Sequence, residues 1–186
     1  HASTLLHGDP EDIAIQIKQK IKETVNLTCS VGVAPVKFLA KIASDMDKPD
    51  GLKVILADDV PRFIDALPIQ KVPGVGKKTF RQLDLMGIKT LGDINRFPKK
   101  TLLDRLGKFG KRLIELSAGN DLSQVTPYAQ HKSISSEHTL GRNTDDKNIL
   151  KGYLLKQAED VAKHMRKARV RGRTITLKLK HADFKQ

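Results

Sequence analysis

The segment that most constrains this fold is a glycine-rich stretch at residues 71–87, KVPGVGKKTFRQLDLMG. Pro73 and Gly74 end a short apolar segment, and the apolar residues around them recur at the spacing of one helix face. These apolar residues are Val72, Val75, Phe80, Leu83 and Met86. The sequence therefore predicts a helix, a tight turn and a second helix.

The residues of this turn suit an anionic ligand. Gly74 and Gly76 place no side chain over the start of the second helix, where backbone N–H groups lack a partner within the helix. Lys77 and Lys78 add the positive charge that a backbone-phosphate site needs. The pattern indicates a helix-hairpin-helix DNA-binding motif in which Gly74, Val75, Gly76, Lys77 and Lys78 contact DNA. An ordinary structural turn with surface lysines is the alternative.

Two other glycine-rich motifs fail on spacing. A P-loop needs a glycine five residues before the Gly-Lys pair, but Lys71 stands there, and no strand-like run leads into the turn. A dinucleotide-binding fingerprint needs a third glycine, but Thr79 stands at that position. The stretch is therefore not expected to bind a nucleotide in either of these ways.

A looser second hairpin is expected at Gly107–Gly110, because apolar residues at helical spacing lie on both sides of it. Its glycines are three residues apart instead of two. Its candidate DNA contacts are Lys108, Gly110 and Lys111, with Arg112 on the same basic arc. Two such hairpins can follow the phosphates of one strand without reading bases. Between the hairpins, the run from Thr90 to Asp93 predicts a capping box.

The charge distribution supports a polyanionic partner. The formal net charge is +13, and residues 71–112 carry 12 basic against 3 acidic side chains, whereas residues 1–70 carry 8 against 10. A membrane surface would attract the same charge, but no helix pairs a basic face with a large apolar one, and no apolar run approaches the ~20 residues of a membrane span. Cys29 is the only cysteine, which favours a reducing, cytoplasmic location.

The residues before the hairpins predict an α/β segment. A helix begins at Pro10, and an alternating strand follows at residues 27–33. A second helix follows Pro35, and a short strand is expected at residues 52–56. The order is helix, strand, helix, strand.

The residues after the hairpins predict a strand at 132–140, a long helix and an alternating strand at 173–180. That last strand would turn Ile175, Leu177 and Leu179 inward and its hydroxyl and ammonium groups outward. The outward face suits a sugar-phosphate backbone, and a solvated polar face is the alternative. The candidate DNA contacts here are Arg173, Thr174, Thr176 and Lys178.

The run at residues 28–51, TCSVGVAPVKFLAKIASDMDKPDG, resembles the late palm segment of Y-family translesion DNA polymerases, in particular the bacterial members. The hairpin at residues 72–76 follows it as the thumb follows the palm in that family. The resemblance implies the C-terminal part of a palm at 1–56, a thumb at 57–124, a linker at 125–131 and the N-terminal part of a little finger at 132–186. The expected fold is an α+β multi-domain fragment with a partial α/β palm, an all-α thumb and a partial α+β little finger.

The resemblance also implies a function. The intact protein would be a DNA-directed DNA polymerase that uses Mg²⁺ and deoxynucleoside triphosphates, binds primer-template DNA through thumb and little finger, and has a sliding clamp as a candidate partner. The family's metal-binding carboxylates would precede His1, so the fragment alone is expected to be inactive and to hold no catalytic residue. A non-catalytic, structure-specific DNA-binding module with tandem hairpins is the alternative.

The same resemblance implies that Lys48 contacts the triphosphate of the incoming nucleotide. A compact ammonium on the turn before a proline suits a polyphosphate oxygen. A solvated loop lysine, offset by Asp45, Asp47 and Asp50, is the alternative.

No metal site is expected in this chain. The three aspartates around Lys48 are interpreted as turn and capping residues. His131, Glu137 and His138 have no further ligand at a usual spacing and are expected on the surface.

Overall fold

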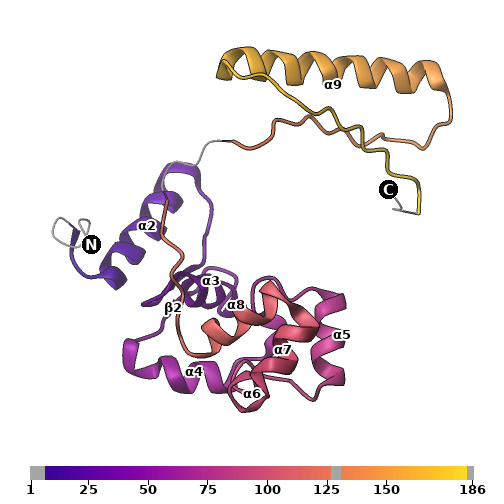
Figure 1. The fold of residues 1–186 in the computed structure, drawn as a ribbon. Helices are drawn as coiled ribbons and strands as arrows, with labels where there is room; N and C mark the ends of the chain where they lie inside the picture. Colours follow the sequence, from indigo (N-terminus) through magenta and orange to yellow (C-terminus); the bar gives the residue numbers. More distant parts are fainter. Residues whose placement is uncertain (1–6, 127–130, 184–186) are drawn as a thin grey trace. The chain divides into compact units, whose positions relative to one another are not determined.

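The computed structural model of the protein describes residues 7–126 and 131–183 (Figure 1). The chain divides into two compact units, His1–Val125 and Thr126–Gln186. The predicted linker at 125–131 lies partly outside the described residues. Across the two described ranges, no helix is long and apolar enough to cross a membrane.

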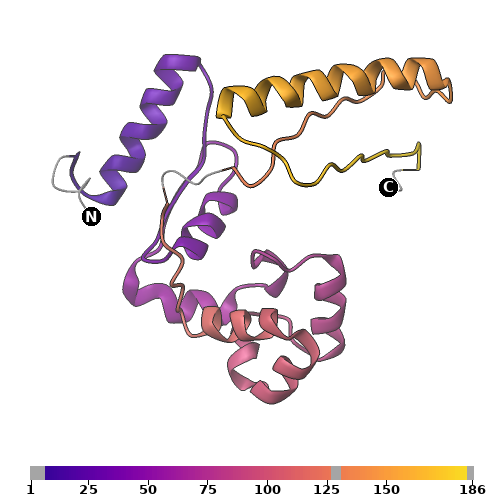
Figure 2. The same ribbon diagram turned by 45° about the horizontal axis from the view of Figure 1, so that its top comes forward.

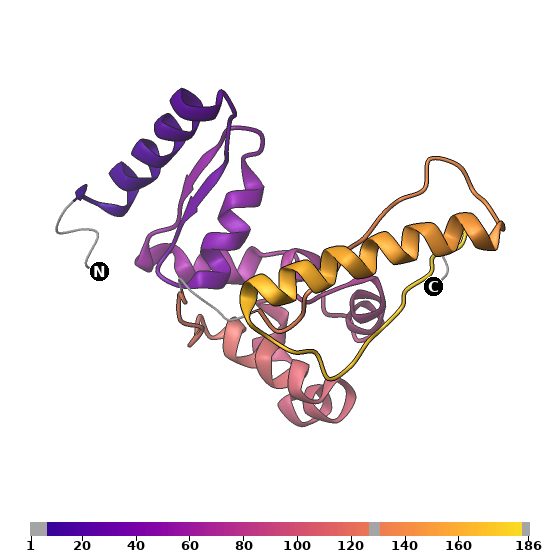
Figure 3. The same cartoon turned by 90° about the horizontal axis from the view of Figure 1, so that it is seen from above.

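The first unit begins with the predicted order of helix, strand, helix and strand. These elements are α2 (Pro10–Val25), β1 (Val31–Val33), α3 (Lys37–Met46) and β2 (Leu52–Val54). The strands pair in parallel, with Val31 opposite Leu52 and Val33 opposite Val54. Figure 3 shows α3 against the two strands and α2 along their other side. The α/β character predicted for this segment is confirmed.

The sheet is smaller than the sequence predicts. The strand expected from residue 27 begins only at Val31, and the strand expected to reach residue 56 ends at Val54. A residue joins a strand only where a neighbour supplies ladder hydrogen bonds, and the two short strands pair over three residues each. Gly32 lets α3 lie close to the sheet, because a Cβ there would be 2.1 Å from the carbonyl oxygen of Ala40.

A single lysine ties α2 to the turn before β2. The Lys18 ammonium donates to the carbonyl oxygens of Cys29 at 2.6 Å and Asp50 at 2.8 Å, and it pairs with the Asp50 carboxylate. The helix itself buries only Ala14. The polar contacts of Lys18 therefore add to the small apolar contact of this helix.

The rest of the first unit is helical, as expected for the segment from residue 57. Its elements are η1 (Ala57–Asp59), α4 (Val60–Ala66), η2 (Ile69–Lys71), α5 (Lys77–Leu85), α6 (Asp93–Arg96), α7 (Lys99–Leu106) and α8 (Lys108–Ser117). Figure 2 shows α5 to α8 gathered in one group. Its core contains the fully buried Leu83, Leu91, Leu102 and Leu113, and the same cluster continues to Leu39 of α3. One apolar core therefore supports both the sheet and the hairpins.

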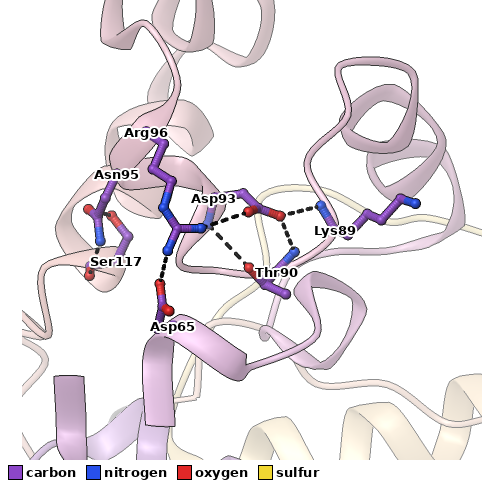
Figure 4. A network of polar contacts seen from close by, with 7 residues as sticks. All are labelled: Asp65, Lys89, Thr90, Asp93, Asn95, Arg96 and Ser117. Carbon is purple, nitrogen blue, oxygen red and sulfur yellow. Dashed lines mark hydrogen bonds and ion pairs between the residues drawn. The ribbon is translucent and has the colours of Figure 1, made fainter. Parts of the chain in front are cut away.

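The predicted capping box is confirmed (Figure 4). The Asp93 carboxylate accepts from the backbone N–H of Thr90 at 2.8 Å, and the Thr90 hydroxyl accepts from the N–H of Asp93 at 3.2 Å. The backbone hydrogen bond from Thr90 holds the pKa of Asp93 below its ordinary value. Arg96, from the same short helix, pairs with Asp65 of α4 at 2.6 Å. These contacts fix the segment that joins the two hairpins.

The second unit holds one long helix, α9 (Lys147–Ala168), in the place predicted for it. Asp146 caps its start by accepting from the N–H of Asn148 at 2.8 Å. Before the helix, the His138 ring stacks on Tyr153, with ring centroids 4.6 Å apart.

The two strands predicted beside this helix do not form. Residues 132–140 and 173–180 carry no strand pairing, and Ile175, expected to face inward, is 99% exposed. Leu177 and Leu179 are exposed as well. An alternating segment becomes a half-buried strand only beside a ladder partner, and none lies within the described parts of this unit.

Candidate nucleic-acid interface

The first hairpin is tighter than the sequence indicates. The predicted first helix is the single turn η2, because Pro68 and Pro73 bracket a segment too short for an α-helix. Within the turn, Val75 donates to the Val72 carbonyl at 3.0 Å and Gly76 donates to the Gly74 carbonyl at 3.2 Å. The N–H groups of Val75 and Gly76 therefore shape the turn itself.

The two glycines of this hairpin have different surroundings. Gly74 has a φ of +98°, and a Cβ there would lie 2.8 Å from Cε2 of Phe109. Gly76 has a φ of −83°, and a Cβ there would meet no atom within 4 Å. The fold therefore needs glycine at position 74, whereas nothing in the described part of the chain needs it at position 76.

The first turn of α5 offers hydrogen-bond donors to the outside. Gly76 is its N-cap and supplies no side-chain cap. The first regular helical bond runs from Phe80 to the Gly76 carbonyl at 2.8 Å, so the amides of residues 77–79 have no partner within the helix. Lys77 and Lys78 are exposed on this turn, and no ion pair is recorded for either within the described ranges. Positive charge and open amides meet here.

The second hairpin turns at Gly107 alone, whose φ is +54°. The helix α8 begins at the next residue, so Gly110 lies inside it and not in the turn. Gly110 is buried, and a Cβ there would be 2.4 Å from the carbonyl oxygen of Leu102. It therefore serves the close packing of α7 on α8, while Lys108 and Lys111 remain exposed.

Arg112 does not contribute to the basic arc that the sequence suggests. Its Nη2 pairs with Oδ1 of Asp121 at 2.7 Å and donates to the Ser123 hydroxyl at 3.3 Å. The expectation that Arg112 joins Lys108 and Lys111 is wrong, because an internal carboxylate holds its guanidinium.

Asp121 is the buried acceptor that sequence reasoning missed. Its side chain is 1% exposed, and it accepts from the backbone N–H of Phe38, at the start of α3, at 2.9 Å. Burial raises its pKa, but hydrogen bonds from Ser123, Arg112 and Phe38 outweigh this and lower the pKa to about 2. Its Asp-x-Ser run is a turn signal, yet nothing local indicates a partner in α3.

Lys48 lies on the turn between α3 and β2. Its ammonium pairs with Asp45 at 2.5 Å, and the hydrogen bond from Lys48 holds the pKa of Asp45 below its ordinary value. Asp50 pairs instead with Lys18, so these carboxylates face different cations. No group of three or more His, Cys, Asp or Glu among the described residues is placed to hold a metal ion.

The candidates of the second unit all follow α9 in extended chain. Arg173, Thr174, Thr176 and Lys178 are exposed there, as are the apolar residues between them. The structure therefore leaves these four side chains open to solvent without sorting them onto one face of a sheet.

Three family models match the chain in order. The impB/mucB/samB family model matches residues 2–45, the IMS family HHH motif matches residues 57–88, and the impB/mucB/samB family C-terminal domain matches residues 131–186. The second of these matches contains the first hairpin.

Relatives and solved structures agree with these matches. A protein named DNA polymerase IV from Methanoculleus marisnigri is 43% identical, over 92% of this chain and 48% of its own length, and one from Shewanella woodyi is 42% identical, over 96% and 50%. The chain thus spans about half the length of the curated relatives it matches. A solved Y-family DNA polymerase chimera superposes with a TM-score of 0.74 at 34% identity, over 88% of this chain and 48% of that one. The chain belongs to the impB/mucB/samB family of Y-family DNA polymerases.

Proposed function

We propose that this chain is the part of a template-directed translesion DNA polymerase that holds primer-template DNA by its backbone. The observation that carries the proposal is the first turn of α5, where open amides lie beside Lys77 and Lys78 and Gly76 leaves the approach clear. Phosphates bind where backbone N–H groups and cations converge. The relatives are named DNA polymerase IV, and one solved neighbour is described as an insertion ternary complex of a DNA polymerase.

In this proposal each segment has a separate task. Residues 1–56 form the C-terminal part of the palm, and residues 57–124 form the thumb, with Gly74 to Lys78 and the exposed Lys108 and Lys111 at the DNA. Residues 125–131 are the linker. Residues 132–186 open the little finger, whose Arg173, Thr174, Thr176 and Lys178 add further backbone contacts. A sliding clamp is a further candidate partner. DNA synthesis by the intact protein would take place in the cytoplasm.

The first hairpin can be tested by removing its charge. Lys77→Ala with Lys78→Ala should flatten the salt dependence of duplex binding, with the slope of log K against log salt falling by up to ~0.9 per lost phosphate contact. Salt titrations of the 186-residue chain on two unrelated duplexes measure this slope. Lys20→Ala with Lys22→Ala, on exposed positions of α2, is the matched control. If both double variants keep the salt slope of the parent chain, Lys77 and Lys78 do not contact the DNA, and the DNA-binding surface lies elsewhere.

The catalytic metals are proposed to bind outside this chain. Two-metal phosphoryl transfer with Mg²⁺ needs closely placed carboxylates, and no group of three or more His, Cys, Asp or Glu among the described residues is placed to hold a metal ion. The chain alone should therefore extend no primer when given Mg²⁺ and all four nucleotides. Extension by the intact protein, with none by this chain, distinguishes a polymerase from the alternative, a DNA-binding module without catalysis. Extension by the purified chain itself would show that the active site lies within it.

Lys48 is proposed to hold the triphosphate of the incoming nucleotide. In the intact protein, Lys48→Ala should lower kcat/KM for nucleotide by roughly 10–100-fold, the worth of one charge-assisted contact, and should leave DNA affinity nearly unchanged. Lys53→Ala, which removes a lysine from the neighbouring strand β2, is the control. If kcat and KM for nucleotide are the same in Lys48→Ala and in the parent protein, Lys48 is a solvated loop lysine that does not contact the triphosphate.

A further inference from the structure

Phe109 lies where the two hairpins meet. It is the second residue of α8, between Lys108 and the buried Gly110. Its ring faces the turn of the first hairpin, because a Cβ at Gly74 would be 2.8 Å from Cε2 and 3.2 Å from Cζ. The ring also packs against the apolar core of the first unit. One side chain therefore contacts both the core and the other hairpin.

The helix that carries this ring is itself fixed. Gly110 brings the α8 backbone so close to Leu102 of α7 that a Cβ would be 2.4 Å from the Leu102 carbonyl oxygen. An interface without room for a methyl group allows little sliding. Gly74, on the other side of the ring, has the positive φ of a defined turn. The ring is thus held between two well-determined backbone segments.

The segments on either side of Phe109 have the same chemistry. Both α5 and α8 begin at a glycine N-cap without a side-chain cap, so the first amides of both helices have no partner within their helix, although Gly110 of α8 is itself buried. Lys77 and Lys78 are exposed on the first helix start, and Lys108 and Lys111 on the second. Phosphates along a DNA strand stand at fixed spacing, so two such helix starts bind together best when the distance between them is fixed beforehand.

We propose that Phe109 is a positioning residue that joins the two hairpins into one surface for the DNA backbone. The inference rests on the proposed DNA-binding function of the first hairpin. With the ring in place, α5 and α8 meet the phosphates of the same duplex at once. Without it, the first hairpin keeps its shared core with α8 but loses the contact at its turn, and its lysines contribute less to binding.

The test is a double-mutant cycle on duplex binding by the 186-residue chain. Phe109→Ala should weaken binding by about tenfold and lower the salt slope. Lys77→Ala with Lys78→Ala should then cost much less affinity in the Phe109→Ala background than in the parent chain. Phe109→Leu, which keeps an apolar contact, should give an intermediate coupling. Phe97→Ala removes a similarly half-buried ring from the end of α6 and should leave the effect of the lysine changes intact.

The outcomes separate this inference from the function on which it rests. If the lysine changes cost the same affinity with and without the Phe109 ring, the hairpins bind independently and the inference fails, while the proposed function stands. If the lysine changes cost nothing in the parent chain, the proposed function fails first. Circular dichroism checks folding, and if Phe109→Ala does not fold, the same cycle with Phe109→Leu decides.

Discussion

Replacement of Asp121 by alanine is expected to lower the free energy of unfolding of the first unit by about 2–4 kcal/mol. The buried carboxylate accepts from the N–H of Phe38 at 2.9 Å, from Arg112 at 2.7 Å and from the N–H of Ser123 at 3.1 Å. The alanine variant leaves these donors without their acceptor and frees the end of α8 from the start of α3. Urea unfolding followed by circular dichroism measures the loss.

A matched control is Asp65→Ala. Asp65 also pairs with an arginine at 2.6 Å, but its side chain is 59% exposed, so its loss should cost less than ~1 kcal/mol. Equal effects of the two variants would mean that the contact between Asp121 and α3 contributes no more than a surface ion pair.

The stability that Asp121 supplies should depend on pH in a defined direction. Its pKa in the folded chain is about 2, below its ordinary value of 3.8, so the unfolded chain takes up the proton first as the pH falls. The contribution is therefore complete above about pH 5 and is lost as the pH falls through 4 toward 2, with a total of about 2 kcal/mol. Asp121→Asn should lack this component. Unfolding midpoints measured from pH 6 to pH 3 should converge between the parent chain and Asp121→Asn.

Local patterns in the sequence predicted the local structure well. The run from Thr90 to Asp93 closes its reciprocal hydrogen bonds as a capping box should, because all of its partners lie within four residues. The second helix of the first hairpin, with Leu83 buried, follows from helical spacing alone. Such features depend on neighbours that the sequence itself displays.

Features that depend on a distant partner could not be predicted in this way. Arg112 looks like one more phosphate-binding cation until the path of the chain brings Asp121 beside it. Gly110 looks like a second turn glycine, but the approach of Leu102 makes it a packing residue. The segment at residues 173–180 has the alternation of a strand, yet alternation cannot supply a ladder partner. A sequence pattern indicates which structure and contacts a segment could form. The residues packed beside that segment in the fold determine whether they form.

The contrast between Gly74 and Gly76 gives the sharpest test of the proposed interface. Gly76→Val should leave the free energy of unfolding within about 0.5 kcal/mol of the parent value, because position 76 has an ordinary φ and open space around a Cβ. Gly74→Val should cost about 2–4 kcal/mol, since it combines a φ of +98° with a clash against Phe109.

The affinity for duplex DNA should not follow the free energy of unfolding, because Gly76→Val should weaken binding without destabilising the fold. In Gly76→Val, the branched side chain stands between a phosphate and the open amides of α5, so affinity should fall by about tenfold, the worth of one or two charge-assisted hydrogen bonds. Much of the salt slope should remain, because Lys77 and Lys78 still meet the phosphates at longer range. Fluorescence anisotropy across a salt series, with unfolding measured on the same samples, gives both quantities. If Gly76→Val is stable and binds duplex with the affinity of the parent chain, no phosphate approaches the amides of α5 past position 76. The first hairpin would then be a structural turn.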